Sequence, residues 1–145
     1  MAYLKIWIHA VWGTKNRQPI LKPPILNTIC THIAGNAKDK GIYIDRINGH
    51  DDHVHVLMLL KADLSIAKQI QLLKGESAYW ANKNNLINGV FEWSAQYFAA
   101  SVSNDKVNLV RNYIDRQQTH HQRRTFQEEY QIFLKGIGYI EGDFS

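Results

Sequence analysis

The sequence predicts an α+β fold, in which helices pack against a sheet of antiparallel strands. Apolar residues alternate with a period of two in some segments, which is typical of strands, and recur every three to four residues in others, which is typical of amphipathic helices. The segments follow the order β-α-β-β-α-β, with two further helices after the last strand. No linker, repeat or low-complexity tract divides the 145 residues. We therefore expect one domain over residues 1–145, with a sheet core over about 1–103 and two helices over about 104–145.

The N-terminal part of the chain predicts a strand and then a helix. Residues 3–14, YLKIWIHAVWGT, place apolar side chains on both faces of an extended segment, which suits a central strand of a sheet. The Pro23-Pro24 pair favours a helix start. Apolar residues at helical spacing run from Ile25 through Lys40, and Gly41 lies where a helix commonly ends.

The next segment predicts a pair of strands joined by a turn. Residues 42–49, IYIDRING, and residues 53–61, HVHVLMLLK, have strand character. Asn48-Gly49 and Asp51-Asp52 supply turn-forming residues between them. These features indicate two neighbouring antiparallel strands.

The second half of the sheet core predicts a long helix and a fourth strand. Asp63 or Ser65 can cap the helix, whose apolar positions recur at spacings of three and four until residues 82–89, NKNNLING. Residues 91–103, FEWSAQYFAASVS, are rich in aromatic and small apolar side chains, and we expect a strand there.

Two helices are expected after the fourth strand. The first begins at Asn104 or Asp105 and extends to about His121, and the second covers residues 125–138, TFQEEYQIFLKGIG. The β-α-β-β-α-β order before them is the ferredoxin-like (RRM-like) arrangement, a four-stranded antiparallel sheet with helices on one face. The other face stays open unless a partner or an added helix covers it.

Charge permits a polyanionic partner without establishing one. The chain has 17 basic and 13 acidic residues, a formal charge of +4 and a pI near 9.2. The basic residues are scattered, and the one tight cluster is Arg123-Arg124 beside His120-His121. A solvated basic surface would have the same composition.

Composition also indicates a cytoplasmic protein with no membrane partner. Cys30 is the one cysteine, which excludes an internal disulfide and fits a reducing compartment. The N-terminal segment carries a lysine and a histidine and lacks a long apolar stretch, so we expect a strand there rather than a signal peptide. The apolar run Val56–Leu60 is too short to span a bilayer.

The triplet His53-Val54-His55 is a candidate metal site. Side chains at i and i+2 of a strand share a face and lie roughly 6.5 Å apart along the backbone. Two imidazoles placed in this way can bind one metal ion. Alternatively, they are polar residues on the wet face of a half-buried strand.

The helix after the fourth strand offers a reacting group and a further ligand. Tyr113 and Gln117 are four residues apart, so their side chains lie on one side of a helix, about 6 Å from each other. In isolation, the same pair could be a tyrosine at a packed edge and a solvated glutamine.

Taken together, these segments resemble the single-tyrosine HUH transposases, the enzymes of small bacterial insertion sequences that act on single-stranded DNA. The resemblance includes the repeat-associated tyrosine transposases and covers nearly the whole chain. It rests on GHDDHVH, which contains the His-apolar-His motif, on RNYIDRQ around the tyrosine, and on LKGESAYW, FEWSAQYFAASVS and QTHHQRRTFQEEYQIFL.

The resemblance implies a DNA strand transferase. Tyr113 inherits the role of a nucleophile that forms a 5′-phosphotyrosine, and His53, His55 and Gln117 inherit the binding of a divalent ion, Mg²⁺ or Mn²⁺. The implied substrate is single-stranded DNA with subterminal hairpins, and no nucleotide cofactor is needed. The family also implies a homodimer with shared active sites, so we expect the partner's tyrosine helix to complete each histidine site.

Several other residues are weaker candidates. Asp52 could orient an imidazole or cap its own turn. Lys74 matches a family position near the DNA, and Arg123 and Arg124 could contact phosphates, although solvated side chains would look the same in the sequence. His9 could approach the site or be a sheet histidine with a structural role.

Two other functions fit parts of the pattern. One is a domesticated relative that binds or nicks chromosomal repeat hairpins, which subterminal hairpins flanking the gene would argue against. The other is a non-catalytic nucleic-acid-binding module on the same sheet. The retention of all four motif residues favours the enzyme.

Overall fold

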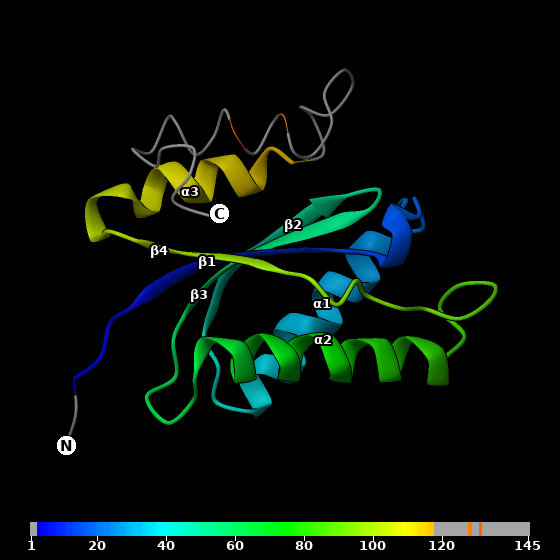
Figure 1. The fold of residues 1–145 in the computed structure, drawn as a ribbon, viewed down its shortest axis with the longest axis horizontal. Helices are drawn as coiled ribbons and strands as arrows, with labels where there is room; N and C mark the ends of the chain where they lie inside the picture. Colours follow the sequence, from blue (N-terminus) through cyan, green and yellow to red (C-terminus); the bar gives the residue numbers. More distant parts are fainter. Residues whose placement is uncertain (1–2, 118–127, 129–130, 132–145) are drawn as a thin grey trace.

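The computed structural model describes residues 3–117, 128 and 131. A four-stranded antiparallel sheet has the order β2-β3-β1-β4, with α1 and α2 on one face and α3 on the other (Figure 1). The predicted α+β, ferredoxin-like fold is therefore confirmed. The elements are β1 (Trp7–Gly13), η1 (Lys15–Arg17), α1 (Ile25–Asp39), β2 (Ile44–His50), β3 (His53–Leu59), α2 (Ile66–Lys83), β4 (Phe98–Val102), η2 (Asn104–Lys106) and α3 (Val107–Asp115).

Each face of the sheet has its own apolar core, because β1 and β3 carry apolar side chains on both sides. Ile8, Trp12 and Val56 belong to the core beneath α1 and α2. The opposite core lies under α3 and contains Trp7, Val11, Leu57, Val102, Val107, Val110 and Ile114. The face that the sequence left open is thus covered by the chain's own third helix.

The fourth strand is shorter than predicted. β4 covers Phe98–Val102, and Trp93 makes an isolated bridge with Thr14. Phe91 and Trp93 are buried in the first core from a loop, where the side-chain amide of Asn82 exchanges hydrogen bonds of 2.7 and 2.9 Å with the Phe91 backbone. The aromatic pattern thus reflected burial rather than strand pairing.

The turn between β2 and β3 also differs from the sequence prediction. Asn48 and Gly49 continue β2 opposite His55 and Val54, so Asp51-Asp52 alone forms the turn. A Cβ on Gly49 would lie 2.1 Å from the His53 carbonyl oxygen, and a glycine is therefore required at this close approach. Of the two predicted N-caps of α2, the structure has Ser65, whose side-chain oxygen accepts a hydrogen bond from the Lys68 amide. The predicted helix over 125–138 lies outside the described residues.

Polar contacts to β2 fix the orientation of α3. The Arg111 guanidinium donates to both carboxylate oxygens of Asp45, from Nε at 2.7 Å and from Nη2 at 2.8 Å. Near the end of the helix, the Asn48 amide donates to the Ile114 carbonyl at 3.0 Å. Together with the apolar core, these contacts hold the C-terminal end of α3 beside the β2-β3 hairpin.

Asp45→Asn is expected to lower the melting temperature at neutral pH by roughly 3–6 °C, because the substitution removes the charge that Arg111 contacts. The hydrogen bond from Arg111 lowers the pKa of the Asp45 carboxyl below its ordinary value, even though partial burial opposes this. A carboxyl with a depressed folded-state pKa stabilises the protein above its unfolded pKa of about 3.9. That stability is lost as the pH falls through the lower folded value.

Thermal unfolding measured between pH 2 and 7 tests this expectation. The wild type should lose more stability than Asp45→Asn below about pH 4. Asp115→Asn is the matched control, because its carboxylate is half exposed and pairs with Arg46 at 3.3 Å. Equal acid profiles for the wild type and Asp45→Asn would contradict a stabilising role for the pair.

Candidate active site

The two motif histidines lie inside the molecule, beneath α3. Antiparallel pairing places Gly13 of β1 opposite His53 and Val11 opposite His55. His53 and His55 are 1% and 0% exposed, and their ring centroids are 5.1 Å apart. They share one face of β3, as the sequence predicted, and that face is buried rather than exposed to solvent.

His53 connects Asp52 to the end of α3. Its Nδ1 donates to Asp52 Oδ1 at 2.7 Å, and its Nε2 lies 3.3 Å from Oε1 of the buried Gln117. The Gln117 amide is oriented by its own Nε2, which donates to the Tyr113 carbonyl at 3.4 Å. Of the two roles that the sequence left open for Asp52, its position matches the acceptor that orients an imidazole.

The other carboxylate oxygen of Asp52 lies near an arginine. Arg17 Nη1 lies 3.8 Å from Asp52 Oδ2. Partial burial alone would raise the pKa of the Asp52 carboxyl, but the hydrogen bond from His53 and the charge of Arg17 outweigh it, and the pKa lies below its ordinary value. Asp52 is therefore an ionised acceptor at neutral pH.

His55 has a different partner on its Nδ1. His9 Nε2 of β1 lies 3.0 Å from this atom, and the two rings stack with centroids 5.2 Å apart. Burial lowers the pKa of His9 to about 3, so this ring is neutral at physiological pH. The Tyr113 ring meets both rings edge-on, with centroids 5.4 Å from His55 and 6.3 Å from His9.

The arrangement of these groups suits a divalent ion. Since the Nδ1–H of His53 donates a hydrogen bond to Asp52, a neutral His53 has its Nε2 lone pair directed toward the Gln117 oxygen. Two acceptor atoms at this distance are stable when a proton or a cation lies between them. A divalent ion held by both atoms would satisfy them in this way.

In the candidate ligand set, the third group is an amide, rather than a carboxylate, a thiolate or another imidazole. Among the residues that the structure describes, no three His, Cys, Asp or Glu side chains gather in an arrangement suited to a metal ion. Gln117 is therefore the group that would complete a site with His53 and His55. Two nitrogens and one oxygen are acceptable to Mn²⁺ and less ideal for Mg²⁺, which prefers oxygen.

The tyrosine helix contacts its own chain's histidines. Tyr113 approaches the pair from α3, and Gln117 approaches it from the turn just after this helix, which ends at Asp115 rather than at the predicted His121. The sequence-based expectation was a site completed by the partner subunit, and in the single chain the tyrosine lies in cis. Exchange of helices within a homodimer stays a prediction.

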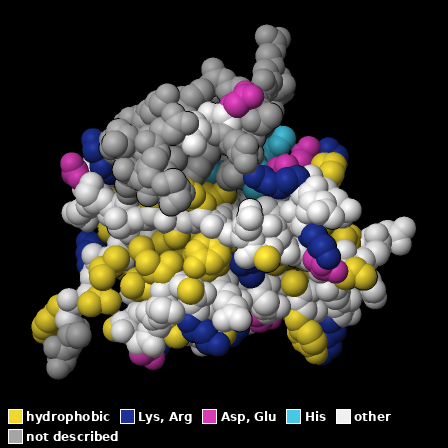
Figure 2. Space-filling view, in the orientation of Figure 1, with side chains coloured by type: hydrophobic (Ala, Val, Ile, Leu, Met, Phe, Trp, Pro, Cys, Tyr) yellow, Lys and Arg dark blue, Asp and Glu magenta, His cyan; other side chains and the backbone are white. Residues whose placement is uncertain are grey.

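The weaker candidates have different positions. Lys74 is on α2, on the sheet face opposite α3, where its ammonium donates to the Ser94 carbonyl at 2.6 Å and lies 5.9 Å from the centre of the Tyr97 ring (Figure 1). Arg123 and Arg124 lie outside the described residues. Lys and Arg side chains form small separate groups on the face shown in Figure 2, as their scatter in the sequence predicted.

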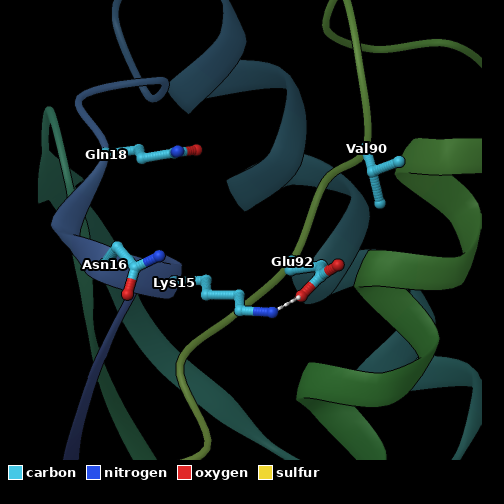
Figure 3. Close-up of a pocket in the computed structure, with 5 residues that line it drawn as sticks. All are labelled: Lys15, Asn16, Gln18, Val90 and Glu92. Carbon is cyan, nitrogen blue, oxygen red and sulfur yellow. Dashed lines mark ion pairs between the residues drawn. The ribbon is translucent and has the colours of Figure 1, made fainter.

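A shallow cavity of about 240 Å³ lies apart from the predicted site residues. Its lining residues are Lys15, Asn16, Gln18, Val90 and Glu92, and a 2.9 Å ion pair joins Lys15 to Glu92 across it (Figure 3). None of these residues is a candidate ligand or nucleophile. The predicted site residues lie in the buried histidine cluster instead.

Comparison with known proteins identifies the family. Residues 2–117 match the sequence profile of the IS200-like transposases. The chain belongs to the IS200-like transposase family. The resemblance drawn from the sequence motifs is thereby confirmed, and membership indicates a DNA-cleaving enzyme.

Two solved structures of other proteins share the fold. A protein of Deinococcus radiodurans R1, inferred to be a transposase, has 24% identity and a TM-score of 0.62, over 81% of this chain and 94% of its own. A REP-associated tyrosine transposase bound to a REP hairpin has 14% identity and a TM-score of 0.57, over 100% of this chain and 92% of its own. Among curated protein sequences no significant match is found. Within the described part of the chain, no helix has the length and apolar character needed to cross a membrane.

Proposed function

We propose that this transposase cuts and rejoins single-stranded DNA, with Tyr113 as the nucleophile and with His53, His55 and Gln117 as ligands of a divalent ion. The carrying observation is the meeting of Gln117 Oε1 and His53 Nε2 at 3.3 Å, beside a Tyr113 ring that lies 5.4 Å from the His55 ring. The fold thus brings an imidazole pair from β3 together with a tyrosine and an amide oxygen from the distant α3 segment.

The proposed reaction is a transesterification. The Tyr113 hydroxyl oxygen attacks the scissile phosphorus and forms a Tyr–O–P bond, while the bond from phosphorus to the 3′ oxygen breaks. The tyrosine loses its proton to solvent, and the departing oxygen gains a proton to give a 3′-OH. A 3′-OH from another DNA end reverses the step, so that rejoining needs no external energy source.

Tyrosine needs help to react at neutral pH, because its hydroxyl has a pKa near 10. A bound divalent ion would polarise the scissile phosphate and stabilise the charge that develops on it. The protein's own contribution is positional. Asp52 holds the His53 ring, Gln117 is held by the backbone of Tyr113, and the apolar core under α3 keeps bulk water from the histidines.

DNA hairpins are the proposed substrate. The family resemblance implies them, and the structurally similar REP-associated transposase is bound to a REP hairpin. The formal charge of +4 is compatible with a DNA partner. Hairpins of the DNA that flanks the gene are the first substrates to try.

A covalent adduct tests the proposal. The full chain is incubated with labelled, hairpin-bearing single-stranded DNA and Mn²⁺ or Mg²⁺, and the products are separated on a denaturing gel. We expect a protein-linked DNA band that disappears with a chelator, and peptide mass spectrometry should locate the DNA on Tyr113. An adduct on another residue would overturn the nucleophile. Stable hairpin binding without an adduct would favour a non-catalytic module.

A further inference from the structure

Both motif histidines have a partner on the same ring atom. For His53, the partner of Nδ1 is the Asp52 carboxylate at 2.7 Å, and for His55 it is His9 Nε2 at 3.0 Å. Metal-binding histidines commonly donate one N–H to such a partner, which orients the ring and leaves the other nitrogen for the metal. Asp52 and His9 therefore occupy equivalent positions around the pair.

The contact between His9 and His55 permits two proton arrangements. Each neutral imidazole carries one N–H, so a hydrogen bond between the facing nitrogens requires a proton on only one of them. If His9 donates, the proton of His55 is on Nε2, where it blocks metal binding. If His55 donates from Nδ1, its Nε2 keeps a lone pair that can bind a metal.

We infer that His9 is a positioning residue whose Nε2 accepts a hydrogen bond from the Nδ1–H of His55 and so keeps the Nε2 of His55 unprotonated and able to bind a divalent ion. The inference rests on the proposed function, because His55 is a ligand only in that proposal. It extends the proposal by assigning the β1 strand a part in the site.

The surroundings of His9 favour such a role over simple packing. His9 is 1% exposed, and its neighbours on the same face of β1 are the apolar Trp7 and Val11. Burying an imidazole among apolar groups costs free energy that an aliphatic side chain at this position would avoid. The hydrogen bond between His9 and His55, at 3.0 Å, offsets part of this cost.

Nitrogen NMR of the imidazole rings tests the inference without a variant. In metal-free wild-type protein labelled with ¹⁵N-histidine, we expect Nδ1 of His55 to carry the proton and Nε2 to be unprotonated. A proton on Nε2 of His55 would overturn the inference, and this readout does not depend on transposase activity.

Two substitutions extend the test to metal affinity. His9→Leu removes the acceptor, and we expect mixed protonation of His55 and Mn²⁺ binding that is about 10- to 100-fold weaker. His9→Gln places an amide oxygen near the former Nε2, and should restore both the proton position and the affinity to within about 3-fold of the wild type. Val11→Ala is the matched control, because it loosens the same face opposite His55 and should leave the proton position unchanged.

The outcomes separate this inference from the proposed function. If the wild type and His9→Leu bind Mn²⁺ equally well, with the same His55 protonation, His9 has no positioning role and the proposed function stands. If the wild type binds no Mn²⁺, the proposed metal site fails, whereas the NMR measurement still decides where His55 carries its proton. Should His9→Leu not fold, the wild type and His9→Gln decide the question by NMR.

Discussion

Tyr113→Phe is expected to abolish the covalent protein–DNA adduct and to lower single-strand cleavage by at least about 1,000-fold, because it removes the attacking oxygen. The phenylalanine ring keeps the edge-on packing against His55 and His9 that the tyrosine makes. Folding and hairpin binding should therefore be unchanged. The variant isolates the hydroxyl from the rest of the side chain.

Adduct formation, cleavage and hairpin affinity are measured side by side for the wild type, Tyr113→Phe and Tyr79→Phe. Tyr79 is a suitable control because its ring is 66% exposed on α2, away from α3. An adduct that persists in Tyr113→Phe would show that another group attacks the phosphate. Loss of hairpin affinity in the same variant would instead indicate a binding role for the hydroxyl.

The same variant can show whose tyrosine serves each site. Tyr113→Phe and His53→Ala subunits are each expected to be inactive alone. In a mixed dimer with exchanged helices, an intact tyrosine meets intact histidines at one site, and activity returns. With the cis arrangement of the single chain, no site in the mixture is complete and activity stays absent.

Local patterns predicted the sheet, because the apolar or polar character of a strand's side chains indicates which of its faces are buried. Apolar side chains on both faces of residues 3–14 indicated a central strand, and β1 lies between β3 and β4 with cores on either side. The same reasoning extended the fourth strand too far, because only residues 98–102 of the predicted 91–103 form β4. Phe91 and Trp93 reach the core from a loop, and a one-dimensional pattern cannot distinguish a side chain buried from a loop from one buried from a strand.

The candidate site was predictable where the motif residues are close in sequence or on one helix face. The pairing of His53 with His55 follows from strand geometry, and that of Tyr113 with Gln117 follows from helix geometry. The contact between the two pairs depends on where α3 docks. A hydrogen bond between Asp45 and Arg111, which are 66 residues apart, contributes to that position. No local sequence pattern predicts this contact.

His9 illustrates what strand pairing adds. The sequence placed it on one face of the first strand with Trp7 and Val11, and left open whether it approached the site. Only the register of β1 against β3, with Val11 opposite His55, brings its ring within hydrogen-bond distance. A polar ring on an otherwise apolar strand face was the available signal, and it became interpretable once the neighbouring strand was known.

Gln117→Ala is expected to weaken Mn²⁺ binding by at least about 100-fold, because it removes the third ligand of the proposed site. Gln117→Glu supplies a carboxylate oxygen near the same position. Divalent ions bind carboxylates well, so its affinity should equal or exceed that of the wild type. A side chain needed only for packing would not be rescued by a buried charge.

Calorimetric titration with Mn²⁺ measures these affinities, with Asn112→Ala as the control that removes an exposed amide from α3, one turn before the segment that carries Gln117. Wild-type affinity in Gln117→Ala would show that Gln117 is not a ligand. The titration also reports on α3 itself, because Gln117 approaches the histidines only when that helix is docked. Tyr113 lies one helical turn before Gln117, so a Gln117-dependent affinity in dilute, monomeric protein would place the nucleophile beside its own histidines before any partner subunit arrives.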